Sequence, residues 1–548
     1  MGFRISRLEL INLFRSGMEM SPQASQPNDP LEQSGVERHD ERAALPHTEG
    51  KDEIENSGGA FFIATLALFA MPAVIALTTY PHYYEDESWL YLAVFERLRG
   101  NGFSWAAFHE GSSIFFTFNA IGSALFALSP FSTEATVRGI SFLFGTCCLV
   151  GIYVLARRIA GANAYIAPVV LTLAPWFVKI RFGRMDCVAL AFAIWALVAA
   201  TRGFPLLAGV LSGLAGGIHP IFIWVGIVCI VLLAQARRWP DLWHYVIGAV
   251  VGILPQLAWI GSHMADFRSI AAHYFVTSSV GHGWLAWLAS LAGEWRRYAS
   301  VGAGVPTLVL LPFVIRAILR ARGRERAVLI TLTVAPLLSL AILVQGKNPY
   351  YYLVYALPAL AVVSAAGVRG LPSRPTKLVC IVALCCSGIF HVYKAKKAAA
   401  LPTVTRSVDL LAARIPPHAA VFSPLVYAGL VVRRPDLQFF TFHSLSRRDG
   451  WHLPPCDDIP AKIRSLLAED PRRTSNMGGE DRDSVFFVLG PGQSEDAFLW
   501  YLRLIYVDAT PADLRCIVGS QQPVPIIHVC GSDPNKCVNL YLVQRPLR

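Results

Sequence analysis

Long apolar stretches, separated by short polar or charged segments, recur along the chain between residues 60 and 393. Most are long enough, or nearly so, to cross the ~30 Å hydrocarbon core of a membrane as an α-helix. The pattern therefore predicts an α-helical polytopic membrane protein. The apolar stretches cover residues 60–79, 112–129, 136–156, 164–180, 186–201, 204–218, 220–236, 243–260, 301–319, 327–345, 350–368 and 377–393.

The composition also indicates a membrane protein and limits the kinds of partner that we expect. The chain is 54% hydrophobic and only 16% charged, whereas soluble domains carry about 25% charged residues. The net charge of +11 comes from Lys and Arg residues placed between apolar stretches, where they set membrane topology. We find no basic stripe interleaved with aromatics, so we expect membrane lipids and no nucleic acid as partners.

The stretch 111–129 decides the orientation, because basic clusters favour the inner side of a membrane. If this stretch crosses the membrane, every later basic cluster is external. If it lies along the membrane as an interfacial helix, and the N-terminus is internal, those clusters all become internal. We therefore predict about eleven spans. The clusters that fall inside contain Arg157, Arg158, Arg202, Arg237, Arg238, Arg316, Arg320, Arg322, Arg324, Arg326, Arg369, Arg374 and Lys377.

The two ends of the chain differ from the apolar middle. Residues 1–20 are mildly amphipathic, and 21–59 are polar and rich in Pro, Gln, Glu and Asp, which predicts a disordered cytoplasmic tail over 1–57 and no signal peptide. Residues 58–397 form the predicted transmembrane domain, with an external loop at 80–133. Residues 398–548 have ordinary polarity and predict an external α/β soluble domain. Its expected strands are 419–422, 437–441, 484–489, 525–529 and 538–543, with helices at 407–414, 458–467 and 495–504.

Four of the eleven cysteines lie in this C-terminal part, and none has the spacing of zinc ligands. Cys530 and Cys537 flank a strong turn signal, Gly-Ser-Asp-Pro-Asn-Lys, so they are placed to meet across a hairpin. A disulfide there requires an oxidising compartment.

Carboxylates follow the first apolar stretch directly. The segment 80–91 contains Glu85, Asp86 and Glu87 between five aromatic residues. Aromatic rings favour the membrane interface, whereas carboxylates at that level suggest chemistry or ion binding. A solvated acidic loop is the alternative interpretation.

The predicted topology places further ionisable residues on the same external face. Each has a plain alternative: Asp186 pairs with a nearby arginine, His219 simply ends a helix, or Lys347 extends to the interface from a span end. The segment 261–300 is also external, as a lid of amphipathic helices or an ordinary interfacial loop. The ionisable and aromatic residues that converge on this face are Asp86, Glu87, Arg181, Arg184, Asp186, His219, Lys347 and Tyr351.

Such a face suits transfer of a group from a lipid-linked phosphate to a hydroxyl. A hydroxyl has a pKa far above 7, so a carboxylate must accept its proton as the new bond forms. A phosphate leaving group is already an anion and needs cationic donors. Asp86 and Asp186 supply candidate bases or metal ligands, and Arg184, Lys347 and His219, with Arg181, supply donors.

The order of these elements resembles the GT-C superfamily of integral membrane glycosyltransferases, in the bacterial branch of protein mannosyltransferase-like and aminoarabinose-transferase-like enzymes. The likeness covers about residues 60–370, and at 109–113 the chain has His-Glu-Gly-Ser-Ser where many relatives carry a His-Pro-Pro-Leu-like stretch. The residues that carry it are Asp86 and Glu87 with Trp89 and Tyr91, Arg157-Arg158 with Gly161, Arg184-Met-Asp186, His219-Pro220, and Lys347 with Tyr351-Tyr352-Leu353.

The resemblance implies an inverting glycosyltransferase at the outer face of a bacterial inner membrane, with 58–397 as its catalytic domain. The donor would be a polyprenyl-phosphate-linked sugar, and the acceptor a lipid, protein or glycan hydroxyl. It implies Asp86 as base, supported by Glu87, with Arg184, Arg181, His219, Lys347 and Tyr351 binding substrate. Asp186 would orient the cations or, with Asp86, bind a divalent metal such as Mg or Mn. A transporter or lipid-linked-sugar flippase is the alternative, although we detect no internal repeat of the kind transporters show.

Overall fold

The structure is a computed structural model, and the residues it describes belong to one compact unit, Asp52–Arg548. They are 58–70, 116–127, 133–174, 185–235, 239–262, 301–343, 353–399, 404–423, 436–441, 453–469, 484–492, 510–518, 525–530 and 537–546, with the single residues 264, 267, 430, 433, 434 and 445.

Apolar helices build the part of the chain before residue 400. Among the described residues, four helices are long and apolar enough to cross a membrane: Arg138–Leu171, Trp239–Ser262, Gly323–Leu343 and Ser373–Tyr393. Shorter apolar helices accompany them, such as Gly58–Ala70. The helices and 3₁₀ turns are α5 (Phe116–Ala127), α6 (Thr133–Ala160), η3 (Gly161–Tyr165), α7 (Ile166–Leu171), α9 (Met185–Thr201), α10 (Pro205–Ile218), η4 (Pro220–Phe222), α11 (Ile223–Gln235), α12 (Trp239–Ser262), α16 (Val301–Arg320), α17 (Gly323–Leu343), η5 (Leu353–Tyr355), α19 (Leu357–Gly367) and α20 (Ser373–Ala399).

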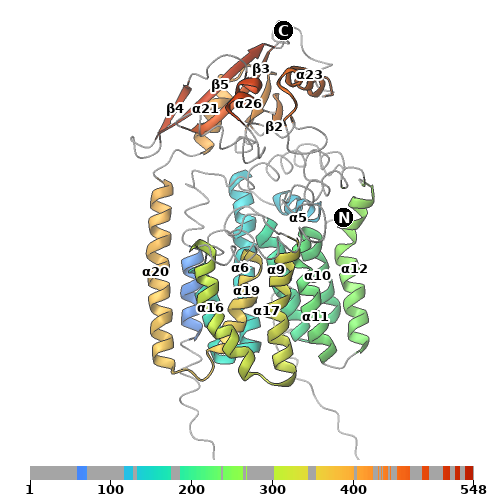
Figure 1. The fold of residues 1–548 in the computed structure, drawn as a ribbon, viewed down its shortest axis with the longest axis vertical. Helices are drawn as coiled ribbons and strands as arrows, with labels where there is room; N and C mark the ends of the chain where they lie inside the picture. The colour runs from blue at the N-terminus through green and yellow to red at the C-terminus, as the bar shows by residue number, and fades with distance from the viewer. Residues whose placement is uncertain are drawn as a thin grey trace, which may run out of the picture. The chain divides into compact units, whose positions relative to one another are not determined.

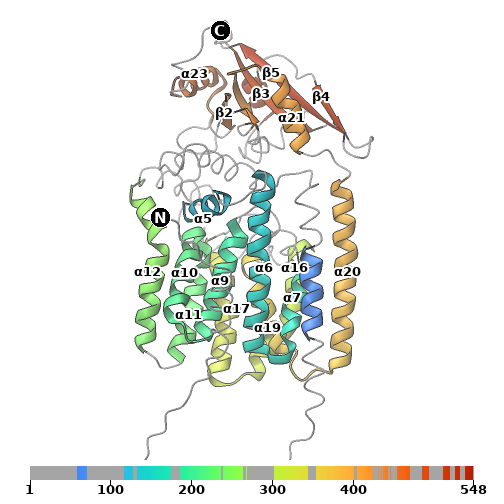
Figure 2. The ribbon, with the colours of Figure 1, turned by 180° about the vertical axis from the view of Figure 1, so that it is seen from behind.

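The long helices run side by side, with α12 at one edge of the helical region and α20 at the other (Figures 1 and 2). Between them, α12 packs on α10, α10 on α9, α9 on α6, and α6 on α19. Helices α6 and α9 are tied by polar contacts: the Trp195 indole N–H donates to the Cys147 carbonyl (2.9 Å), and the Cys187 thiol donates to the Ser141 hydroxyl (3.3 Å). The helices that carry candidate site residues therefore form one packed layer.

Glycines allow α10 and α12 to touch through their backbones. A Cβ atom at Gly209, Gly213, Gly248 or Gly252 would lie 2.1–2.3 Å from a carbonyl oxygen of the facing helix. Both helices carry glycines four residues apart, which is the small-residue pattern of close helix packing in membranes. This contact fixes the position of α10, whose C-terminal end leads to His219.

A five-stranded sheet follows the helices. Its strand order is β2-β1-β3-β5-β4; β1 is parallel to β2 and to β3, whereas β5 is antiparallel to β3 and to β4. The elements of this α/β region are α21 (Val404–Arg414), β1 (Ala420–Ser423), β2 (Gln438–Thr441), η8 (Cys456–Asp458), α23 (Ile459–Glu469), β3 (Ser484–Gly492), α26 (Pro511–Val518), β4 (Pro525–Cys530) and β5 (Cys537–Pro546).

Helices cover both faces of the sheet, with α21 and α26 on opposite sides (Figures 1 and 2). One face buries Phe422 and Phe487 against Ile463 of α23 and Ile517 of α26. Side chains alternate between faces along a strand, so Val421, between Ala420 and Phe422, lies on the other face. The strands are continuous apolar runs, such as Val-Phe-Phe-Val-Leu at 485–489, so the sheet is apolar on both sides.

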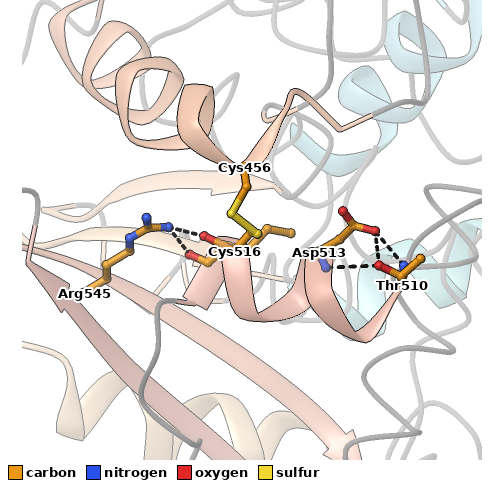
Figure 3. The surroundings of a disulfide bond; sticks show 6 residues. Cys456, Thr510, Asp513, Cys516 and Arg545 are labelled. Atoms are coloured by element: carbon orange, nitrogen blue, oxygen red, sulfur yellow. Dashed lines mark hydrogen bonds between the residues drawn. A yellow bond between two sulfur atoms is a disulfide. The ribbon is translucent and has the colours of Figure 1, made fainter.

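A disulfide joins the helices on one face. Cys456, just before α23, is bonded to Cys516 in α26 (Figure 3). At the start of α26, Asp513 and Thr510 form reciprocal side-chain-to-backbone hydrogen bonds, the arrangement of an N-terminal capping box. At its end, Arg545 of β5 donates to the carbonyl oxygens of Cys516 and Ile517, both at 2.6 Å.

Cys530 is also disulfide-bonded. It lies directly opposite Cys537 in the β4–β5 register. The hairpin that the sequence predicted thus brings these two cysteines together.

The predicted elements agree with the structure where it describes them. All five expected strands are present, and the stretch 111–129 contains a helix, α5, twelve residues long. Its position along the membrane interface stays a prediction. Helix α7 ends at Leu171 and is followed by a turn to Ala174, earlier than the apolar stretch 164–180 suggested. Helix α26 was not predicted. The expected helix at 495–504 lies outside the described residues, and the number of spans, the domain boundaries and the soluble nature of the C-terminal part stay predictions.

Candidate polar site at the end of helix α9

Asp186 stands in the first turn of α9 and is only 4% exposed. A carboxylate is favoured at a helix N-terminus, because the exposed backbone N–H groups and the helix dipole are positive there. Its partner from a distant part of the sequence is Tyr355, the last residue of η5, whose phenol O–H donates a hydrogen bond to Asp186 Oδ1. Tyr355 is 1% exposed, so both groups of this bond are buried.

His219 lies where α10 ends and η4 begins. Its backbone is extended (φ −148°, ψ 119°), as expected for a residue before proline. The Ile221 N–H donates to His219 Nδ1 (3.2 Å). A ring nitrogen that accepts carries no proton, so the imidazole is neutral and Nε2 bears its proton. His219 can therefore act as a hydrogen-bond donor rather than as a cation.

The two predicted site residues meet at Tyr355. The His219 and Tyr355 ring centroids are 5.0 Å apart, and Phe222 stands edge-on to Tyr355 at 5.3 Å. Residues 186, 219 and 355 come from three segments far apart in sequence, and the fold brings them to one buried point. Tyr355 was not singled out in the sequence, because an aromatic residue near Tyr351 is equally consistent with plain packing.

A buried arginine lies on the neighbouring helix and was also missed. Arg138, in α6, is 7% exposed. It comes three residues before Ser141, which contacts Cys187, the residue after Asp186. In the sequence it only marked the start of an apolar stretch, and nothing in that pattern separates a functional arginine from one at a span end.

Helix α5 is anchored beside the end of α10. The side-chain oxygen Gln256 Oε1, in α12, accepts from the Thr117 backbone N–H (3.1 Å) and hydroxyl (3.2 Å). Phe116 stacks on Trp259 with ring centroids 5.2 Å apart. A Cβ atom at Gly217, two residues before His219, would lie 3.2 Å from the Thr117 hydroxyl. The start of α5 is therefore fixed close to the chain that bears His219.

Helix α20 contacts the end of α7, from which the chain continues towards Asp186. The Thr172 carbonyl, just beyond α7, accepts from the Ser387 hydroxyl (2.8 Å) and lies 3.4 Å from His391 Nε2. Because α7 stops there, this carbonyl has no place in a continuing helix, and α20 supplies the partner. The segment that begins at this point leads to Arg181, Arg184 and Asp186.

The remaining predicted site residues, Asp86, Glu87, Arg181, Arg184, Lys347 and Tyr351, lie outside the described residues. The segments 109–113 and 263–300, apart from residues 264 and 267, also lie outside them. Within the part of the chain that the structure describes, no group of three His, Cys, Asp or Glu side chains is placed to hold a metal ion.

Comparison with known proteins defines the class. Residues 116–346, less than half of the chain, match the model of Glycosyltransferase family 87. The fold is similar to the crystal structure of ArnT from Cupriavidus metallidurans bound to undecaprenyl phosphate, with a TM-score of 0.53 and 14% identity over 88% of this chain and 97% of that one. The structure of ArnT from the same organism in the apo state gives a TM-score of 0.54 and 13% identity, over 89% of this chain and 98% of that one. No curated protein matches the chain.

These similarities establish the GT-C fold of integral membrane glycosyltransferases, as the resemblance in the sequence implied. With its apolar helices, the chain is a multi-pass membrane protein of that fold. The likeness spans nearly the full length of ArnT, including the α/β region, although few residues are identical.

Proposed function

We propose that the protein moves a sugar from a polyprenyl-phosphate carrier to a hydroxyl of a lipid, protein or glycan acceptor. The reaction takes place at the outer face of a bacterial inner membrane and inverts the anomeric carbon. The donor class is suggested by ArnT, which shares the fold and has been seen with undecaprenyl phosphate.

The observation that carries the proposal is the meeting of Asp186 and His219 at Tyr355. Ionisable side chains are costly in a membrane domain, and they usually face the interior and mark a functional site. The buried Asp186 carboxylate at the start of one helix and the partly buried His219 imidazole at the end of another meet at one tyrosine within the helical bundle. Packing alone gives no reason for such a grouping.

The transfer is a single in-line displacement. The acceptor oxygen forms a bond to the anomeric carbon while the bond from that carbon to the phosphate oxygen breaks. The hydroxyl proton passes to the Asp86 carboxylate, which is the general base. The carrier phosphate leaves as an anion with the bonding electron pair, and Glu87 supports the loop that presents Asp86.

Cations and donors hold the departing phosphate. Arg184, Arg181 and Lys347 provide positive charge, and the Arg fork bonds two phosphate oxygens at once. His219 adds its Nε2–H, because Nδ1 accepts a backbone N–H. Tyr351 contacts the carrier beside Lys347.

A divalent metal such as Mg or Mn is a further element of the proposal. Such ions prefer carboxylate oxygens, and Asp186, a carboxylate already fixed by the Tyr355 phenol, is a suitable ligand together with Asp86. The metal would neutralise phosphate charge. If no metal binds, Asp186 orients the cations instead.

The orientation rests on two features of different chemistry. The Cys456–Cys516 disulfide and the disulfide-bonded Cys530, both in the α/β region, favour an oxidising compartment such as the periplasm. Basic residues such as Arg158, Arg320 and Arg369 gather at the helix ends that the topology places inside.

The test incubates purified protein with radiolabelled polyprenyl-phosphate sugars and a membrane extract. We expect covalent transfer by the wild type, loss of about a thousandfold or more in the Asp86→Asn variant, and normal transfer by Asp241→Asn, a control at the other end of the spans. Movement of the labelled lipid without transfer would identify a flippase. Absence of both transfer and lipid movement would favour a binding protein. Transfer by Asp86→Asn at a near-normal rate would overturn the assignment of Asp86 as base. Activity retained in EDTA would rule out a role for a divalent metal.

A further inference from the structure

Arg138 is the buried charged side chain that the proposed mechanism does not use. A guanidinium inside a membrane domain is expensive unless it is paired or serves a ligand. Helix α6 carries two other arginines, Arg157 and Arg158, in its last turn. Those two belong to an internal basic cluster, whereas Arg138 stands near the opposite end and is 7% exposed.

The register of α6 against α9 gives the level of Arg138. Cys187 contacts Ser141, and eight residues later Trp195 contacts Cys147, so the two helices run side by side in the same direction. Arg138 is three residues before Ser141, and Asp186 is one residue before Cys187. At a rise of ~1.5 Å per residue, the two backbone positions lie within about 3 Å of each other along the helix axes.

The direction of the side chain follows from helix geometry. Residues three apart lie on one face of a helix, so Arg138 shares the face by which Ser141 meets α9. Helical side chains also lean toward the N-terminus, which for α6 is the end shared with Asp186. Arg138 therefore lies at the level of the buried Asp186, which accepts the Tyr355 hydrogen bond.

We propose that Arg138 is a further phosphate-binding residue of the donor site, contributed by α6; this rests on the function proposed above. The neutral His219 offers a single donor, whereas a guanidinium always carries its charge and presents five N–H groups in a planar fork that fits two phosphate oxygens. In a buried layer the charge is poorly screened, and its attraction for a phosphate is stronger than at a surface.

The experiment measures binding of undecaprenyl phosphate to the purified full-length protein in detergent, by native mass spectrometry and by the rise in melting temperature. Undecaprenol and inorganic phosphate are the comparison ligands. We expect Arg138→Gln to weaken binding of undecaprenyl phosphate about tenfold or more. Undecaprenol should bind the variant and the wild type alike, because it has no phosphate to recognise. Arg158→Gln, the same change at the exposed, opposite end of α6, should have no effect on either lipid.

Arg138→Lys keeps the positive charge but lacks the planar guanidinium, so we expect it to bind undecaprenyl phosphate with intermediate affinity. This variant decides the question if Arg138→Gln does not fold. Wild-type affinity in either folded variant would overturn the proposal and make Arg138 a structural ion-pair member. Equal weakening of undecaprenol and undecaprenyl phosphate would also overturn it, because the loss would then concern the lipid tail. Failure of the wild type to bind undecaprenyl phosphate would instead reject the proposed function itself.

Discussion

Glycines bring α10 and α12 of the helical region into backbone contact, whereas aromatic side chains and a disulfide close the α/β region. At Gly213 a Cβ atom would lie 2.3 Å from the Ala249 carbonyl oxygen. In the sheet, Phe422 stacks between Phe440 and Phe487 at 5.0 and 5.3 Å. Both regions are closely packed, but through different chemistry.

The difference follows from the solvent each region would meet. In lipid, helices gain little from burying apolar surface against each other, so close backbone approach and interhelical hydrogen bonds must hold them. In water, burial of phenylalanine is itself the main driving force. Cross-links such as Cys456–Cys516 add to it by restricting the unfolded chain. Mutations of the same kind should therefore have unequal effects in the two regions.

The largest effect is expected for Gly213→Ala. The new methyl group would meet the Ala249 carbonyl at 2.3 Å and the Ile253 nitrogen at 2.8 Å, so α10 and α12 must separate. We expect a loss of about 3 kcal/mol or more in stability, seen as a lower melting temperature of the purified protein. Gly216→Ala is the matched control, because nothing lies within 4 Å of that position and alanine favours a helix. Equal melting of the two variants would contradict the glycine contact.

Removal of the disulfide should have the next largest effect. The bond joins cysteines 60 residues apart, and a disulfide typically contributes about 2–4 kcal/mol to stability, with the lower end common in practice. We expect Cys456→Ser to speed proteolysis and hydrogen exchange in α23 and α26 while α10 and α12 stay protected. Cys385→Ser, at a free cysteine of α20, should change neither. Loss of protection in α10 and α12 would show that the two regions are not separately stabilised.

An ion pair in the α/β region gives a smaller, pH-dependent effect. Arg434 bonds both Asp436 oxygens at 2.8 Å, and the His418 N–H donates to the same carboxylate. The Arg434 guanidinium, with the His418 N–H, holds the pKa of Asp436 well below its ordinary range. Arg434 also caps the end of α21, donating to the Ala412 carbonyl at 2.6 Å.

A lowered folded-state pKa stabilises the protein above the unfolded value, about 3.9, and the benefit is lost as pH falls through the folded one. Asp436→Asn should cost about 1 kcal/mol at pH 7, since the pair is partly exposed, and progressively less below pH 4. Hydrogen exchange in β1 and β2 of the full-length protein, measured at pH 7 and pH 3, checks this. A cost that stays constant between the two pH values would rule out the charge interaction.

The sequence predicted those features that depend on local pattern. The apolar run 485–489 predicted β3, and the turn signal between Cys530 and Cys537 predicted their hairpin. The polar site was predicted in part, because Asp186 and His219 interrupt apolar stretches and are visible for that reason. Each of these signals lies within about ten residues of chain.

Contacts across long separations were not predictable. In the sequence, Tyr355 is one of several neighbouring aromatic residues, and only the fold shows its hydrogen bond to Asp186. Arg138 has the position of an ordinary arginine at a span end, and only the packing of α9 on α6 shows that it is near Asp186. Cys456 and Cys516 have no spacing signature. The hydrogen bond from Ser387 of α20 to the Thr172 carbonyl, just beyond the end of α7, joins residues 215 apart in sequence.

The smallest change in stability, with a large change in activity, is expected for Tyr355→Phe. Phenylalanine keeps the ring against His219 and Phe222 and removes only the hydrogen bond to Asp186. Single hydrogen bonds between membrane helices contribute about 0.6 kcal/mol on average, so the melting temperature should hardly move.

Sugar transfer by Tyr355→Phe should nevertheless fall about tenfold or more, mainly in kcat, because the carboxylate that orients the site loses its fixed partner. Tyr245→Phe is the control: it removes a comparable buried hydrogen bond, from Tyr245 to Ser212 at 2.9 Å, between α12 and α10. That variant should lose similar stability and keep its kcat. If both variants lost kcat equally, the loss would reflect packing of the whole bundle. The hydrogen bond between Tyr355 and Asp186 would then have no particular role in sugar transfer. A loss confined to Tyr355→Phe would show that the helical region separates its two tasks, with glycines for cohesion and buried polar groups for chemistry.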